Sequence, residues 1–120
     1  MTPLAHRLQL KHGRRLALID PPAALAALAD LPAAASSDEA EIVLAFAANR
    51  AALDAHLADW SHRFLSTAIL WLAYPKLTSA VAADLSRDTV RAMAAAAGLD
   101  TIAQIAIDDD WSAMRVKPLG

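Results

Sequence analysis

One apolar run in the middle of the chain constrains the fold more than any other feature. The segment from Thr67 to Tyr74 is almost entirely apolar and stops at Pro75-Lys76, and a stretch of mixed residues follows before the next strong helix signal at Ser86. A short apolar run with these boundaries is typical of a buried parallel strand that ends in a long loop. In open α/β sheets, the loops beyond the carboxyl ends of the strands hold the ligand. The sequence therefore predicts a site between Tyr74 and Leu85.

The other segments alternate between strand and helix patterns. Two further strands are expected at residues 15–20 and 41–47. A short helix should start at Thr2-Pro3, and three longer helices are expected behind the capping residues Asp20, Asn49 and Ser86. The first of these longer helices should stop at Pro32, and the last should end at Gly98. Apolar residues at helical spacing support the last two helices: Leu53, Leu57, Trp60 and Phe64 in one, and Val90, Met93, Ala94 and Ala97 in the other.

The last two strands should form a hairpin. Residues 101–108 and 112–117 read as strands, and the few residues between them are too short for a parallel crossover. Every other connection contains a helix, so the first four strands should run parallel and only the last should be antiparallel. These patterns predict one domain over residues 1–120. Its fold should be a small three-layer, Rossmann-like α/β sandwich of about five strands.

Composition excludes several classes of protein. The chain has 11 basic and 13 acidic residues and a net charge of -2. Its single basic cluster, at residues 11–15, is typical of a solvated turn, so we expect no binding to nucleic acid. No apolar run approaches the roughly 18 residues of a membrane helix, so no membrane association is expected. The first residues lack the apolar core of a secretory signal, and there is no cysteine to oxidise. A cytoplasmic location is the expectation.

The first strand-to-helix turn argues against a bound cofactor. Dinucleotide and S-adenosylmethionine (SAM) folds place glycines there, because the backbone must approach the cofactor closely. Here the turn reads Ile19-Asp20-Pro21-Pro22-Ala23, which has no glycine and two prolines that lack backbone donors. We therefore predict no cofactor. The four histidines show no metal-ligand spacing, so we also predict no metal site and expect each histidine on the surface.

Candidate ligand-binding residues cluster around the predicted loop and hairpin. Lys76 could supply a site cation, although a lysine at the rim of a sheet can equally extend into solvent. The aspartates could act as ligands or bases, but the hairpin-turn interpretation is stronger, and Trp111 could simply close the sheet edge. Arg115 should lie farther from the rim than Lys76, Asp84 and Trp111 do. The full set of candidates is Tyr74, Lys76, Ser79, Asp84, Asp108, Trp111 and Arg115.

Several of these residues also belong to motifs that support a family resemblance. The motifs are Thr2-Pro3-Leu4-Ala5 with Leu8 and Lys11-x-Gly13, Leu70 to Lys76 with Ser79, Ala83-Asp84-Leu85, and Ile107-Asp108-Asp109-x-Trp111-Ser112 with Arg115. The chain resembles a family of small, uncharacterised bacterial proteins, a domain of unknown function with a reduced Rossmann-like, methyltransferase-like architecture. The resemblance implies a fold rather than an activity. This sequence departs from the family between Leu31 and Glu41, where a longer segment with another strand is expected, so the region for a nucleotide ribose is abbreviated.

Two functional hypotheses follow from the sequence. The first is a small cytoplasmic binding or interaction module, with a homodimer as one option, on a methyltransferase-like fold that has lost its cofactor site. The second is a small enzyme, or a protein that binds a small anion or metabolite, whose crevice uses Lys76, Asp84 and Trp111. No residue pattern identifies a reaction.

Overall fold

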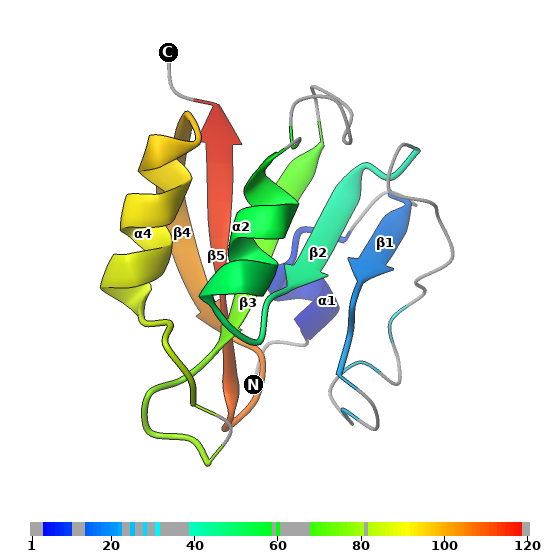
Figure 1. The fold of residues 1–120 in the computed structure, drawn as a ribbon. Coiled ribbons are helices and arrows are strands. Elements are labelled where there is room, and N and C mark those ends of the chain that lie inside the picture. The colour runs from blue at the N-terminus through cyan, green and yellow to red at the C-terminus, as the bar shows by residue number, and fades with distance from the viewer. Residues whose placement is uncertain are drawn as a thin grey trace.

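The computed structural model of the chain contains one five-stranded sheet (Figure 1). It describes residues 4–10, 14–22, 25, 28, 31, 39–58, 60, 68–80 and 82–118. The strands are β1 (Leu16–Ile19), β2 (Ile42–Phe46), β3 (Ile69–Pro75), β4 (Leu99–Ala106) and β5 (Trp111–Pro118), in the spatial order β1-β2-β3-β5-β4. β1, β2 and β3 are parallel, whereas β5 is antiparallel to both β3 and β4. The predicted parallel sheet with a C-terminal antiparallel hairpin is confirmed.

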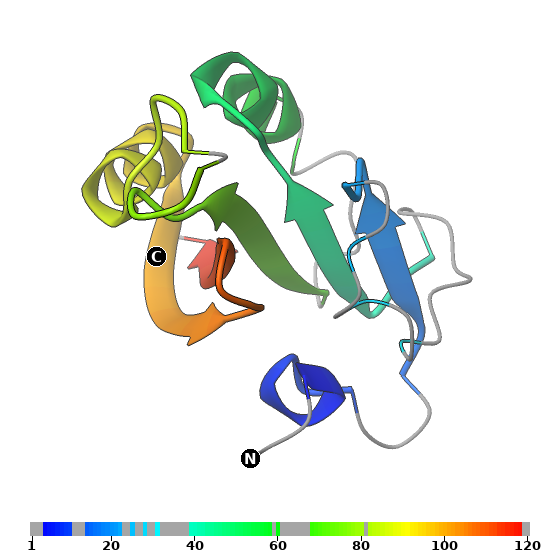
Figure 2. The same ribbon diagram turned by 90° about the horizontal axis from the view of Figure 1, so that it is seen from below.

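Helices cover both faces of this sheet. They are α1 (Leu4–Arg7), α2 (Arg50–Ala58) and α4 (Arg87–Ala96). Figure 2 shows α2 and α4 together on one face and α1 on the other, which confirms the three layers. The α1 segment is held to its face by the indole of Trp71, which donates to the Leu8 carbonyl at 3.2 Å.

Local capping signals account for the limits of α2 and α4. The side chain of Asn49 accepts from the Ala52 amide at 2.9 Å, and Ser86 accepts from the Thr89 amide at 3.2 Å. Gly98 has a φ of 87°, in the left-handed region that glycine adopts easily after a helix. The predicted caps at Asn49 and Ser86 and the predicted stop at Gly98 are therefore confirmed.

The predicted cap at Asp20 is wrong. A capping residue needs extended backbone, but Asp20 has a φ of 52°. Pro21, Pro22 and Leu25 are not helical, and Leu28 lies in a 3₁₀ turn. Leu31 is not helical either, and the other residues of the predicted helix lie outside the described part of the chain, as does Phe64 of the next helix.

Successive side chains along each strand point to opposite faces of the sheet, and this divides the core into two halves. Residues such as Val43, Leu72 and Met114 pack on the face covered by α2 and α4. Their neighbours in sequence, including Leu44 and Trp71, pack on the α1 face. No helix in the described ranges is long and apolar enough to cross a membrane.

Candidate functional site

The floor of the candidate site is the α4 face of the sheet, at the end where β3 stops. Ser112 lies directly opposite Tyr74 on one side and Ala106 on the other, so these side chains share a face. Gln104 is two residues before Ala106 on the same face, and its amide donates to the Tyr74 hydroxyl at 3.2 Å. Because α4 begins only at Arg87 and does not cover this end, the floor stays open above these residues.

The walls of the site come from the loop after β3 and from the start of α4. Together with the floor they enclose a crevice of about 440 Å³. Its described lining residues are Tyr74, Lys76, Leu77, Thr78, Ser86, Arg87, Gln104, Ala106 and Ser112. The location agrees with the general rule that ligands bind beyond the carboxyl ends of the strands.

A hydrogen-bond network ties the loop after β3 to the β4–β5 hairpin. The Lys76 amide donates to the Asp110 carbonyl at 2.8 Å, and its Nζ donates to the Asp108 carbonyl at 2.7 Å. The Ser79 hydroxyl donates to the Asp110 carboxylate at 2.6 Å. The Asp108 carboxylate closes its own turn, because it accepts from the amides of Asp110 and Trp111, each at 2.8 Å. The ammonium group of Lys76 is therefore held in place at the crevice.

The structure separates three of the candidate residues from this crevice. Asp84 accepts from the Arg50 amide at 2.8 Å and so belongs to the start of α2. Trp111 is buried on the α1 face, where its ring meets Phe46 edge to face at 5.4 Å. Arg115 lines another hollow, with Arg14. Tyr74 and Lys76 line the crevice, while Ser79 and Asp108 support it through hydrogen bonds.

The electrostatics of the crevice favour a negatively charged ligand. Lys76 and Arg87 bring two positive charges, and no acidic residue is found among the described residues that line it. Burial raises the pKa of the Tyr74 hydroxyl; the charge of Arg87 opposes this change and that of Asp88 adds to it. Tyr74 is therefore a protonated phenol at neutral pH and can donate a hydrogen bond. Ser112, a residue that is 5% exposed, adds a hydroxyl that has no hydrogen-bond partner within the described residues.

Sequence reasoning missed Arg87 and Gln104. Arg87 was detectable, because it follows the Ser86 cap at the end of the loop where a site was expected. Gln104 was not, because its position beside Tyr74 depends on β5 lying between β3 and β4.

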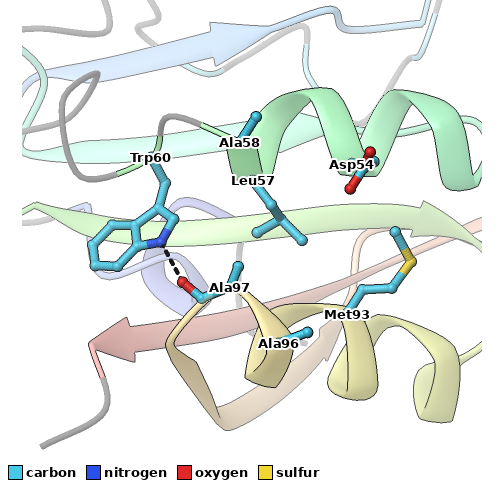
Figure 3. A pocket seen from close by; sticks show the side chains of 7 residues that line it. All are labelled: Asp54, Leu57, Ala58, Trp60, Met93, Ala96 and Ala97. Carbon is cyan, nitrogen blue, oxygen red and sulfur yellow. Dashed lines mark hydrogen bonds between the residues drawn. The ribbon is translucent and has the colours of Figure 1, made fainter.

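A second hollow, of about 380 Å³, lies between α2 and α4 (Figure 3). Figure 3 shows the indole of Trp60 reaching toward the end of α4, where it donates to the Ala97 carbonyl at 2.8 Å. Leu57 and Met93 line the same hollow, and its one charged group is Asp54 among the described residues. The hollow lies between two helices rather than at strand ends, and its main polar contact joins the helix ends. We assign it a packing role.

His56 is buried, so its predicted position on the surface is wrong. It is 5% exposed, its Nε2 lies 2.7 Å from the Phe46 carbonyl, and the carboxylate of Asp20 is 3.7 Å from the same nitrogen. These groups meet where β1 and β2 end. The described residues contain no group of three or more histidine or acidic side chains placed to hold a metal.

Comparison with known proteins identifies solved structures with a similar fold. No protein-family model and no curated protein matches the sequence. The structure of LepI in complex with SAM matches with a TM-score of 0.53 and 13% identity, over 96% of this chain and 39% of that one. The fold is Rossmann-like and of the methyltransferase type. A second LepI structure, in complex with SAH and a substrate analogue, matches with a TM-score of 0.52 and 14% identity, again over 96% of this chain and 39% of that one.

The ribosomal protein L11 methylase from Lactobacillus delbrueckii subsp. bulgaricus matches with a TM-score of 0.49 and 8% identity, over 78% of this chain and 41% of that one. This Rossmann-like chain thus spans about two fifths of the length of these solved structures. At such low identity the comparisons establish the fold alone.

Proposed function

We propose that this chain is a small binding or interaction module on a methyltransferase-type fold without a working SAM site. The observation that carries the proposal is the turn after β1, where a cofactor of this kind needs close backbone approach and amide donors. Pro21 and Pro22 supply no amide donor, and Asp20 holds a left-handed backbone that turns the chain.

The position of His56 supports the same proposal. The ends of neighbouring parallel strands β1 and β2 are where a ligand sits in this class of fold. Here the buried imidazole of His56 occupies that place, between the Phe46 carbonyl at 2.7 Å and the Asp20 carboxylate at 3.7 Å. The Nε2 of His56 donates to the Phe46 carbonyl, so a cofactor that needed this position would have to displace that hydrogen bond.

Isothermal calorimetry with SAM tests this proposal. The purified chain should give no binding heat at SAM concentrations up to about 1 mM, a range that would reveal interactions worth about 4 kcal/mol or more. A dinucleotide should give the same result. Micromolar binding of either cofactor would overturn the proposal.

A second candidate function is the binding of a small organic anion in the crevice beyond β3. Lys76 and Arg87 supply the charge, and the hydroxyls of Tyr74 and Ser112 supply donors on the floor. Charge-assisted hydrogen bonds to carboxylate oxygens are the strong interactions such a set can form. A small enzyme would hold its substrate in the same crevice.

A thermal-shift assay with malonate, succinate and citrate tests the crevice. An anion at a hundred times its Kd should add about 2.7 kcal/mol to the stability of the folded chain. Lys76→Ala should remove this gain, while its own loss of one hydrogen bond should cost only about 1 kcal/mol. Lys117→Ala, at the exposed end of β5, is the matched control and should keep the gain. An equal loss in both variants would count against a site in the crevice, and a Lys76→Ala chain that fails to fold would show that the lysine is structural.

The cytoplasmic location and the option of a homodimer belong to the same proposal. The location rests on the sequence, which has no cysteine that would need an oxidising compartment. Measurement of the molecular mass in solution would test the homodimer.

A further inference from the structure

Arg115 faces a hollow that the proposed function does not use. It lies opposite Trp71 in the sheet, so its side chain is on the α1 face, whereas Ser112 and the crevice are on the α4 face. Arg14, Glu41 and Ile69 line the same hollow, which encloses about 350 Å³. Ile69 begins β3, and Glu41 and Arg14 lie just before β2 and β1. The hollow is therefore at the amino ends of the parallel strands, at the opposite end of the sheet from the crevice.

The charges around this hollow are unbalanced. The Glu41 carboxylate is already engaged, because it accepts from the Arg15 amide at 3.1 Å and lies 3.5 Å from the Arg15 Nε. The Arg14 guanidinium donates through Nη1 to the Gln9 carbonyl at 3.0 Å and has no carboxylate partner among the described residues. Since Arg15 neutralises Glu41, the two guanidinium groups of Arg14 and Arg115 leave an excess positive charge.

Arg115 carries the strongest indication of a ligand. It is half-buried, and within the described ranges its guanidinium group forms neither a hydrogen bond nor an ion pair. A guanidinium that is partly removed from water loses hydration, and this loss is usually offset by an anion that accepts its hydrogen bonds. In this structure the hollow is the space in which such an anion would sit.

We propose that this hollow binds the phosphoryl group of a small phosphate ester. Guanidinium groups present a planar fork of donors that matches phosphate oxygens, and two of them match the charge of a dianion better than that of a single carboxylate. The apolar side chain of Ile69 gives the organic part of the ester a surface to contact. A nucleic acid is a poorer fit, because the chain has a net charge of -2 and phosphate-backbone binding needs an extended basic surface.

Calorimetric titration with phenyl phosphate tests this site, with Arg115→Gln and Arg14→Gln as the variants. Each should weaken binding about tenfold, the effect of losing one charge-assisted hydrogen bond. Arg91→Gln removes the same charge from the exposed face of α4, where Arg91 contacts Thr101, and should change affinity less than about twofold. An equal loss in Arg91→Gln and Arg115→Gln would show unspecific charge attraction and overturn the proposal.

Two further measurements separate this site from the crevice. Phenyl phosphate should shift the amide resonances of residues 14, 41, 69 and 115 in nuclear magnetic resonance spectra; shifts confined to crevice residues 76–78, 86 and 87 would place the ligand there and contradict the inference. Affinity should also rise between pH 5 and pH 8, because the second phosphate proton leaves near pH 6 to form the dianion. The absence of phenyl phosphate binding to the unmodified chain at millimolar concentration would likewise overturn the inference, without affecting the proposal for the crevice.

Discussion

Tyr74 stands where the buried sheet meets the crevice, and its environment makes stability depend on pH. Burial raises the pKa of its hydroxyl, so as pH rises the unfolded chain loses this proton before the folded chain does. The contribution of Tyr74 to stability is therefore complete below about pH 10 and is lost as the pH rises through the folded pKa. Urea unfolding between pH 9 and pH 11 should show a steeper loss of stability for the unmodified chain than for Tyr74→Phe. Parallel curves would contradict this account.

His56 is the second residue whose surroundings give a quantitative expectation. His56→Leu should lower the free energy of unfolding by about 1–3 kcal/mol, because it leaves the buried Phe46 carbonyl without its 2.7 Å partner. His6→Leu is the matched control; His6 is exposed, so the change should stay within about 0.5 kcal/mol. Chemical denaturation of both variants measures the difference. Similar effects at the two positions would show that the His56 contact contributes little.

The success of sequence reasoning at the residue scale depended on the range of the interactions. Lys76 and Tyr74 were identified because they end an apolar strand, a signal carried by the local sequence. The burial of His56 could not be predicted, because its partners Phe46 and Asp20 come from other elements. Trp111 was misplaced for a related reason. In the hairpin its neighbour Ser112 faces the crevice, so alternation directs Trp111 to the α1 face.

At the scale of elements, Gly98 offers a clean test of how α4 ends. A Cβ at Gly98 would meet nothing within 4 Å, so the cost of Gly98→Ala should come from the left-handed backbone alone. We expect a loss of about 1–2 kcal/mol in the free energy of unfolding. Gly98→Asn should lose less, because asparagine tolerates this conformation better than alanine does. Equal losses for the two variants would indicate a steric cause instead.

The elements that sequence located correctly are those with local boundary signals. Asn49 and Ser86 accept hydrogen bonds from amides three residues ahead, and this spacing is visible in the sequence. Aspartate is also a common capping residue, yet Asp20 adopts a left-handed backbone and its carboxylate lies 3.7 Å from the His56 Nε2. Nothing in the local sequence around Asp20 indicates this backbone conformation.

At the scale of the whole molecule, connection lengths were enough to predict strand direction. The short link between β4 and β5 requires an antiparallel pair, and that pair follows three parallel strands. The position of β5 between β3 and β4 determines which side chains line the crevice. It places Ser112 between the strands that carry Tyr74 and Gln104, and the side chains of these two residues form a hydrogen bond. That arrangement involves residues 30 positions apart, as the Gln104–Tyr74 hydrogen bond shows, and was beyond sequence reasoning.

Chemical-shift mapping by nuclear magnetic resonance tests most directly the claim that a ligand binds beyond β3 and that SAM does not bind beyond β1. Citrate should shift the amides of residues 76–78, 86, 87, 104 and 106, which line the crevice. SAM at the same concentration should leave the amides of Ile19, Asp20 and residues 47–49 unchanged, because Pro21 and Pro22 supply no donor and His56 is buried at that end of the sheet. Shifts of these amides with SAM, together with none at the crevice with citrate, would contradict the account.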